Sequence, residues 1–386
     1  MARPLRVALI AGEHSGDNLG AGFIEALRRL EPEARFVGVA GPRMVEAGCE
    51  RWEDADSLAV MGLFEVLRHL PRLLRLKRRL VTRLLAEPPD VFVGIDAPEF
   101  NLSIAPVLHA AGIPTVQYVS PQVWAWREGR VKRMARMLDL VLCLLPFEAE
   151  FYRTHRLRAE FVGHPLADRL PLQPDRETAR RELGLPEEAT VVALLPGSRR
   201  GEYERLSADL AGAAAWLVGQ RRGLVFAAPM ASESARKCFA AALEREAPGV
   251  DCLLVNGQAA RVMSAADVVV TASGTATLET LLCKRPMVVV YRLGAATAWV
   301  LRRLRLVKST FFSQPNLLAG SALVPELFQD AVSAESVGRE VLRWLDSPGA
   351  VADLEQTFLG IHQTLRRGAS EQAAEAVLAL LRDRGG

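Results

Sequence analysis

Short apolar runs rich in β-branched residues alternate with longer segments of helical periodicity along most of the chain. Because these runs are continuously apolar, each strand must be buried on both faces, as in a parallel sheet covered by helices. The pattern predicts an α/β protein with two doubly wound, Rossmann-like parallel-sheet domains that face each other across a cleft. The predicted strands are Leu5–Ala11, Phe36–Ala40, Val91–Ile95, Thr115–Val119, Leu140–Leu145, Val191–Leu195, Leu224–Ala228, Cys252–Val255, Val268–Thr271 and Met287–Tyr291.

A proline-containing gap separates the two series of runs. It includes Gly163-His164-Pro165, Pro171 and Pro174, and a fresh helix over 175–183 follows it. A chain of 386 residues is also too long for one ordinary core. We therefore expect domains at 1–168 and 169–386, with C-terminal helices able to pack back on the first domain or on a second subunit.

Charge and cysteine usage exclude several classes of protein. The formal net charge of +3 is too balanced for a histone-like or ribosomal nucleic-acid binder. The five cysteines form no C-x-x-C pair, which argues against a zinc knuckle or a disulfide framework. The apolar run Val7–Ala11 is too short for a signal peptide, and prolines interrupt the uncharged stretch 101–126. We expect a cytoplasmic chain that spans no membrane and binds no nucleic acid.

Metal chemistry has little support in the sequence. Asp54-Ala55-Asp56 spells the D-x-D pattern of metal-dependent glycosyltransferases, but we place it between helical stretches and interpret it as a coincidence. No H-E-x-x-H, EF-hand loop or His/Cys cluster is present. We expect neither a metal site nor a cofactor.

Ligands of doubly wound folds bind beyond the carboxyl ends of the strands. The first predicted strand is followed by a glycine-rich turn, which contains Glu13, Ser15, Gly16 and Asp17 and leads into a helix. Such a turn suits an anion, although its spacing matches neither a dinucleotide fingerprint nor a P-loop. Helix capping by Ser15 or Asp17 is the alternative.

Two further features follow strands of the first half. Asp96 comes directly after a strand and could act as a general base on a hydroxyl, or cap the helix that starts near Pro98. Trp124 and Trp126, beside Arg127, could form a platform for a sugar or an acyl chain, or could pack in the core.

The second half carries the elements of a nucleotide-diphosphate pocket. Arg199, in the small-residue turn with Gly197 and Ser198, could pair with a diphosphate. The turn Ser273-Gly274-Thr275 opens a helix whose N–H groups could hold phosphate, and Glu279 could accept the hydroxyls of a ribose. The amide-rich segments 314–320 and 324–329 could bind sugar hydroxyls, or simply form turns.

A basic helix is predicted after Val66, where seven basic and no acidic residues occur up to Ala86. Arg68, Arg72, Arg75, Arg79 and Arg83 share one face, and leucines including Leu73, Leu76 and Leu80 cover the other. We expect Pro71 in the first turn of this helix, with 63–70 as a separate short piece. The pattern indicates a membrane-surface helix or a core helix with a solvated face. Arg302, Arg303, Arg305 and Lys308 form a second basic stretch.

An ordered set of motifs resembles the lipid A disaccharide synthases, a family of inverting glycosyltransferases with the two-domain GT-B architecture. The motifs are Gly12-Glu13-x-Ser15-Gly16-Asp17, Val60-Met61-Gly62, Ile95-Asp96-Ala97-Pro98, Val119-Ser120-Pro121 with Val123 to Arg127, Phe161-Val162-Gly163-His164, Leu195 to Arg199, Ala272 to Ala276 with Glu279, and Pro315 to Gly320.

The resemblance implies a reaction and its location. The family joins UDP-2,3-diacylglucosamine to 2,3-diacylglucosamine 1-phosphate, which gives a β-1,6 disaccharide 1-phosphate and UDP. Both sugars are lipids of the inner membrane of Gram-negative bacteria. The resemblance therefore favours peripheral membrane contact on the cytoplasmic face through Arg68, Arg72, Arg75, Arg79, Leu73, Leu76 and Leu80, and it suggests a homodimer.

Site roles also follow from the resemblance. Asp96 would deprotonate the acceptor 6-hydroxyl, and Glu13, Ser15, Gly16 and Asp17 would form the acceptor or first loop. Gly197, Ser198, Arg199, Ser273, Gly274 and Thr275 would hold the diphosphate, Glu279 the ribose, and Asn316 a polar position of the donor site. Another UDP-N-acetylglucosamine enzyme (a 2-epimerase or a peptidoglycan-type transferase) or a membrane-anchored nucleotide-sugar-binding module remains the alternative.

Overall fold

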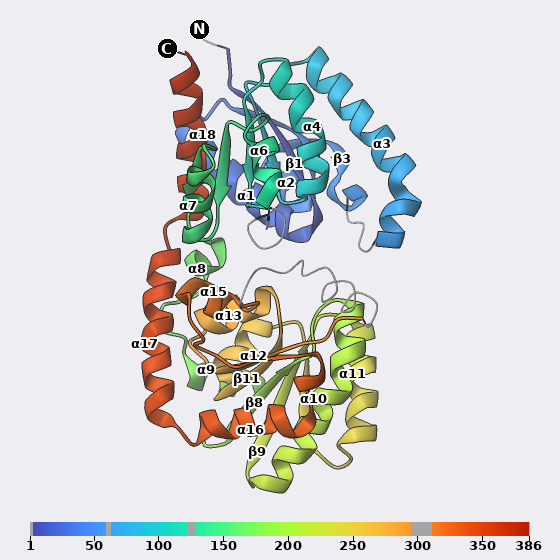
Figure 1. Ribbon diagram of the computed structural model, residues 1–386, viewed down its shortest axis with the longest axis vertical. Helices are drawn as coiled ribbons and strands as arrows, with labels where there is room; N and C mark the ends of the chain where they lie inside the picture. Colours follow the sequence, from blue (N-terminus) through green and yellow to red (C-terminus); the bar gives the residue numbers. More distant parts are fainter. Residues whose placement is uncertain (1–2, 59–62, 122, 124–127, 295–310, 386) are drawn as a thin grey trace. The chain divides into compact units, whose positions relative to one another are not determined.

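The computed structural model describes residues 3–58, 63–121, 123, 128–294 and 311–385, with residues 63–69 described by their backbone alone. The chain divides into two compact units. The first consists of Met1–Asp168 and Leu365–Gly386, and the second of Arg169–Thr364. Each unit is built on one parallel sheet flanked by helices (Figure 1).

The first unit contains a sheet in the order β3-β2-β1-β4-β5-β6-β7. Its strands are β1 (Arg6–Ala11), β2 (Arg35–Ala40), β3 (Cys49–Asp54), β4 (Val91–Ile95), β5 (Thr115–Tyr118), β6 (Leu140–Cys143) and β7 (Ala159–Phe161). All neighbouring strands pair in parallel. The chain leaves β1 toward β2 and returns on the other side at β4, so the winding direction reverses between β1 and β4.

Helices cover both faces of this sheet. They are α1 (Glu13–Leu30), α2 (Pro42–Glu46), α3 (Leu63–Ala86), α4 (Pro98–Ala110), α6 (Val131–Met134), α7 (Pro146–Thr154), α8 (Pro165–Arg169) and α18 (Ala369–Gly385). Alternate residues of β1 point to opposite sides. Leu9 packs into a core with α1 and α18, whereas Ile10 packs into a core with α3 and α4. The C-terminal helix α18 thus completes the first unit, beside α1 (Figure 1).

Helix α3 is one continuous helix of 24 residues, with Pro71 inside it. The prediction that Pro71 starts the main helix was therefore wrong. A proline interrupts a helix by removing one N–H donor and by crowding the preceding turn, but continued helical pairing on either side can carry the chain past it.

The second unit contains a sheet in the order β10-β9-β8-β11-β12-β13. Its strands are β8 (Thr190–Leu195), β9 (Leu224–Met230), β10 (Cys252–Asn256), β11 (Val268–Ala272), β12 (Met287–Tyr291) and β13 (Glu326–Phe328). Its helices are α9 (Arg176–Leu183), α10 (Arg200–Gln220), α11 (Glu233–Glu246), α12 (Ala259–Ala265), α13 (Thr275–Leu282), α15 (Gln314–Ala319), α16 (Ala334–Leu345) and α17 (Pro348–Leu365). The order reverses between β8 and β11, as it does between β1 and β4.

Local chemistry sets the ends of these elements. Helix α9 begins after Asp175, whose carboxylate accepts the N–H of Thr178 at 2.9 Å, and ends at Gly184 in the left-handed conformation.

All ten predicted runs form strands. Strands β3, β7 and β13 were not predicted, because each is short or rich in charged residues.

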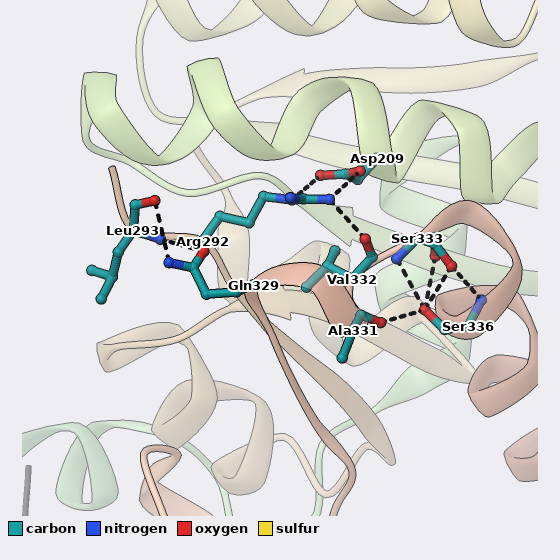
Figure 2. A network of polar contacts seen from close by, with 8 residues as sticks. All are labelled: Asp209, Arg292, Leu293, Gln329, Ala331, Val332, Ser333 and Ser336. Carbon is teal, nitrogen blue, oxygen red and sulfur yellow. Dashed lines mark hydrogen bonds and ion pairs between the residues drawn. The ribbon is translucent and has the colours of Figure 1, made fainter. Parts of the chain in front are cut away.

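Polar contacts fasten the segment that follows β12. Arg292 forms a two-pronged ion pair with Asp209 of α10, at 2.6 and 3.0 Å, and donates to the carbonyl of Val332 at 2.7 Å (Figure 2). The side chain of Gln329 accepts the N–H of Leu293 at 3.2 Å. Gln329 was one of the amides considered for sugar binding, but its carboxamide holds the backbone here.

Candidate functional site

The first group of site residues lies where the winding of the first sheet reverses. Neighbouring strands β1 and β4 end there, and the loops after them carry Gly12 and Asp96. These loops touch, because a Cβ atom on Gly12 would lie 2.7 Å from the Cβ of Ala97. Only glycine fits at this approach, so the first-loop motif and the predicted base lie together at the ligand-binding edge of the sheet.

Asp96 is half-buried, and its carboxylate is oriented by a neighbour. Its Oδ2 accepts a hydrogen bond from the Ser15 hydroxyl at 3.1 Å. Its backbone N–H donates to the Tyr118 carbonyl at 2.9 Å, and its own carbonyl accepts from Asn101 and Gln117 at 2.8 and 3.0 Å. Sequence reasoning missed Asn101 and Gln117, which act on Asp96 through its backbone alone.

Backbone strain concentrates at this edge. Asp96 has a φ of 52°, Ala97 of 37° and Glu13 of 59°, all in the left-handed region that residues with a Cβ rarely adopt. Such strain persists only where surrounding contacts impose it, and it is commonly found at functional sites. The hydrogen bonds to the Asp96 backbone are contacts of this kind.

Asp17 is a buried carboxylate that is hydrogen-bonded within the protein. It is 1% exposed, and its carboxylate accepts the N–H groups of Arg43 and Met44 at 2.9 and 3.0 Å, at the start of α2. Its function is to hold that helix against α1. Its acceptor or first-loop role stays a prediction, whereas the exposed Ser15 hydrogen-bonds to Asp96 and Glu13 is half-buried. Gly16 is buried, and a Cβ atom added to it would lie 3.6 Å from the Ile95 carbonyl oxygen.

The second group of site residues lies at the equivalent reversal of the second sheet. The turn after β8 contains Gly197, Ser198 and Arg199, and Arg199 is exposed just before α10. The backbone N–H groups of Ser198 and Arg199 donate to Glu202 Oε2 at 3.2 and 3.3 Å. The sequence did not reveal Glu202, although a glutamate three residues after the helix boundary is typical of a capping box.

The turn after β11 leads into α13 next to this loop, because β8 and β11 are paired neighbours. Gly274 has a φ of +135°, and Thr275 begins the helix and is exposed. The Ser273 hydroxyl donates to the Phe312 carbonyl at 3.0 Å, which links this turn to the segment before α15. The first turn of α13 therefore presents its backbone N–H groups at the same sheet edge as Arg199.

Glu279 is a half-buried carboxylate on α13. Burial raises its pKa, and the charge of Arg169 partly opposes that rise. Within the described residues it forms no hydrogen bond or ion pair. A half-buried acid without a partner in the protein is well suited to accept hydroxyl groups from a ligand, since a bound ligand would restore the hydrogen bonds lost on burial.

Asn316 also has a role within the fold, and its place in the donor site stays a prediction. It is 1% exposed, and all its side-chain hydrogen bonds are made within the protein. Its Oδ1 accepts the N–H groups of Leu323 and Val324 at 2.8 and 3.0 Å, and its Nδ2 donates to the Val324 carbonyl and to Glu326, both at 2.9 Å. Asn316 holds the loop between α15 and β13 and offers no free group to a donor sugar.

Helix α3 divides its leucines between core and surface. Leu76 and Leu80 are 2% and 3% exposed and pack against the first sheet, so the predicted membrane contact is wrong for these two. Leu73 is half-buried, whereas Leu70 and Leu74 are 42% and 54% exposed.

The arginines of α3 that the structure describes are all exposed, but their contacts differ. Arg79 forms an ion pair with Glu53 at 2.6 Å, whereas Arg72 and Arg75 form no ion pair within the described residues. Further along, Arg83 pairs with Glu50 of β3 at 3.1 Å and stacks on Trp52.

Some predicted site residues lie outside the described residues. They are the side chain of Arg68, the motif 60–62, Trp124, Trp126 and Arg127, and the basic stretch 302–308.

The D-x-D sequence proved to follow a strand, since Asp54 is the last residue of β3. Its carboxylate accepts from Arg51 at 2.9 Å and from the N–H of Asp56 at 3.0 Å, which closes a local turn. In the part of the chain that the structure describes, no group of three or more His, Cys, Asp or Glu residues could hold a metal ion. None of the described helices is long and apolar enough to cross a membrane.

Known proteins resemble this chain over nearly its whole length. Residues 7–377 match the family described as Lipid-A-disaccharide synthetase. The lipid-A-disaccharide synthase of Alkalilimnicola ehrlichii is 54% identical over 377 residues, which cover 97% of this chain and 98% of that protein. The lipid-A-disaccharide synthase of Alcanivorax borkumensis is 50% identical over 375 residues, which cover 97% of each.

Two solved structures show the same fold at much lower identity. The glycotransferase of kitacinnamycin has a TM-score of 0.64 at 17% identity, and the match covers 98% of this chain and all of that one. The UDP-GlcNAc 2-epimerase from Neisseria meningitidis, bound to UDP-GlcNAc, has a TM-score of 0.64 at 10% identity over 97% of this chain and all of that one. Such distant likeness shows the fold alone, so it does not favour the epimerase alternative. The chain belongs to the lipid-A-disaccharide synthetase family, and it is a glycosyltransferase with the GT-B fold.

Proposed function

We propose that the enzyme transfers the diacylglucosamine unit of UDP-2,3-diacylglucosamine to the 6-hydroxyl of 2,3-diacylglucosamine 1-phosphate, with inversion. The products are the β-1,6 disaccharide 1-phosphate and UDP. Membership of the family over nearly the full chain supports this reaction. The observation that carries the proposed mechanism is the carboxylate of Asp96, half-buried and oriented by Ser15 where the strand order reverses.

Asp96 is proposed as the general base. Ser15 engages Oδ2, and within the described residues Oδ1 has no partner, so Oδ1 is free to accept the proton of the acceptor 6-hydroxyl. As that proton leaves, the hydroxyl oxygen forms a bond to the anomeric carbon of the donor while the bond to UDP breaks. Direct displacement of this kind inverts the configuration at the anomeric carbon. General-base assistance contributes about 10²- to 10⁴-fold to such a step.

The second unit is proposed to hold the leaving UDP. Negative charge develops on the diphosphate as its bond to the sugar breaks, and the exposed Arg199 guanidinium together with the first-turn N–H groups of α13 would stabilise it. Glu279 would accept the ribose hydroxyls, which explains a half-buried carboxylate without a partner in the described protein. The proposed chemistry uses no cofactor.

The test of this function is an assay with both lipid substrates and the purified protein. We expect UDP release only when the UDP-diacylglucosamine and the acyl-sugar 1-phosphate are present together, with formation of a disaccharide. Epimerisation of the donor without acceptor would identify a 2-epimerase. Binding without UDP release would identify a nucleotide-sugar-binding module.

We also propose that the enzyme works as a peripheral protein on the cytoplasmic face of the inner membrane, where its lipid substrates would lie. Exposed side chains of α3 support this, and we call Leu70, Arg72, Leu74 and Arg75 the α3 patch. Exposed leucines beside arginines suit an interface of acyl chains and anionic headgroups. Homodimer formation stays a prediction from the resemblance alone.

A further inference from the structure

The side chain of Glu202 folds back across the loop that joins β8 to α10. Its Oε2 accepts the N–H groups of Ser198 and Arg199 at 3.2 and 3.3 Å. A Cβ atom on Gly197 would lie 2.5 Å from the Cβ of Glu202 and 2.7 Å from its Oε2. Gly197 also has a φ of +111°. A glycine at this position therefore makes the space in which the carboxylate lies.

The N–H groups bound by Glu202 belong to the loop proposed to receive the diphosphate. The start of a helix favours negative charge, and here a side chain of the protein already supplies it. The neighbouring charges come from several elements. Burial and then the charge of Glu202 raise the pKa of Tyr291 at the end of β12, whereas Arg199 and Arg205 lower it. Glu202 and Arg199 thus act on one small region at the carboxyl ends of β8 and β12.

We propose that Glu202 sets the affinity of the site for UDP, because its carboxylate occupies the loop N–H groups in competition with the diphosphate and repels it. This inference rests on the proposed function. A carboxylate here opposes UDP binding while Arg199 favours it, so product UDP is held less tightly than the cationic loop alone would hold it. A residue that merely caps α10 needs only an acceptor oxygen, which glutamine also supplies.

The variant Glu202→Gln separates the two roles, since it keeps the acceptor and removes the charge. We expect UDP to bind about three- to tenfold more tightly to Glu202→Gln than to the wild type in low salt, the range for loss of one nearby like charge in a partly solvated site. The gain should shrink as salt is raised, because ions screen the repulsion. Isothermal titration calorimetry with UDP measures both. The donor KM of Glu202→Gln should fall in the same proportion.

Glu204→Gln is the matched control. Glu204 lies on the same helix, is exposed and pairs with Arg200 at 2.7 Å, away from the loop N–H groups. It should leave UDP affinity unchanged. Equal or weaker UDP binding by Glu202→Gln would overturn the inference, as would an equal gain in Glu204→Gln. Circular dichroism verifies that both variants are folded.

A third variant, Arg199→Ala, distinguishes failure of this inference from failure of the proposed donor site. If Arg199→Ala weakens UDP binding about tenfold or more, as expected for a lost charge-assisted contact, while Glu202→Gln changes nothing, then Glu202 is only a helix cap. If neither variant changes UDP binding, UDP does not bind at this loop, and the proposed site itself is wrong.

Discussion

The substitution Asn316→Ala tests whether Asn316 contacts the donor or supports the loop. The side chain is 1% exposed and makes four hydrogen bonds of 2.8 to 3.0 Å, three to the loop between α15 and β13 and one to Glu326 at the start of β13. Alanine would leave the N–H groups of Leu323 and Val324 without their acceptor. Each buried donor left unpaired costs about 1–3 kcal/mol, so we expect the free energy of unfolding to fall by about 2–5 kcal/mol.

Urea unfolding followed by circular dichroism measures this loss of stability. Isothermal titration calorimetry on the folded protein measures its UDP affinity. The structure predicts a lower urea midpoint with UDP affinity within a few-fold of wild type. Asn256→Ala is the control, because Asn256 is an exposed asparagine of the same unit, and its removal should change stability by about 0.5 kcal/mol or less. An unchanged midpoint together with a tenfold loss of UDP affinity would refute the reasoning and return Asn316 to the donor site.

Three further predictions concern the base, the ribose contact and the membrane. Asp96→Asn should lower turnover by about 10²-fold or more and leave UDP affinity within a few-fold, and near-wild-type turnover would remove Asp96 from the mechanism. Burial raises the pKa of Glu279 above the ordinary glutamate value of 4.5. As the pH rises above 4.5, the folded state must carry a charge that burial disfavours, so the free energy of unfolding falls. Glu279→Gln should therefore be more stable than wild type to urea at pH 7 but not at pH 4, and it should bind UDP less tightly. Wild-type affinity in that variant would exclude the ribose contact. Replacing the two leucines of the α3 patch by serine and its two arginines by glutamine should release the protein from anionic vesicles. The same variant should keep its activity in a detergent assay. The control, Arg222→Gln with Lys237→Gln, removes the same charge from the second unit, and unchanged vesicle binding by the patch variant would assign the patch a structural role only.

The strands that the sequence predicted are those whose own residues require burial. Continuous apolar runs such as Val91–Ile95 have no stable position except inside a sheet, so their pattern alone indicates the fold. Strand β3, with the sequence Cys-Glu-Arg-Trp-Glu-Asp, lies at the sheet edge and carries no such run. It forms a strand because β2 offers a row of unpaired backbone N–H and C=O groups. The residues of β3 themselves do not show that this partner is present.

The site follows the same division. The glycine-rich turns and the acid after β4 were visible in the sequence, because loops after parallel strands must lie at one edge of the sheet. What each polar side chain does there was not visible. Asp17 and Asn316 have the residue types expected of ligand contacts. However, the carboxylate of Asp17 accepts the N–H of Met44, which is remote in sequence, and the amide oxygen of Asn316 accepts the N–H of Val324, in a loop that folds back on it.

The amphipathic pattern of α3 likewise did not distinguish core from surface. Leu74 and Leu76 are two residues apart and have the same side chain, but one is 54% and the other 2% exposed. Periodicity determines that a helix has an apolar face, and only packing decides which part of that face the sheet covers. The sequence by itself therefore determined the α/β class, the order of the strands along the chain and the loops that carry chemistry. The tertiary structure alone decided which side chains are already satisfied within the protein and which remain for a ligand, because a hydrogen bond depends on where remote groups come to lie.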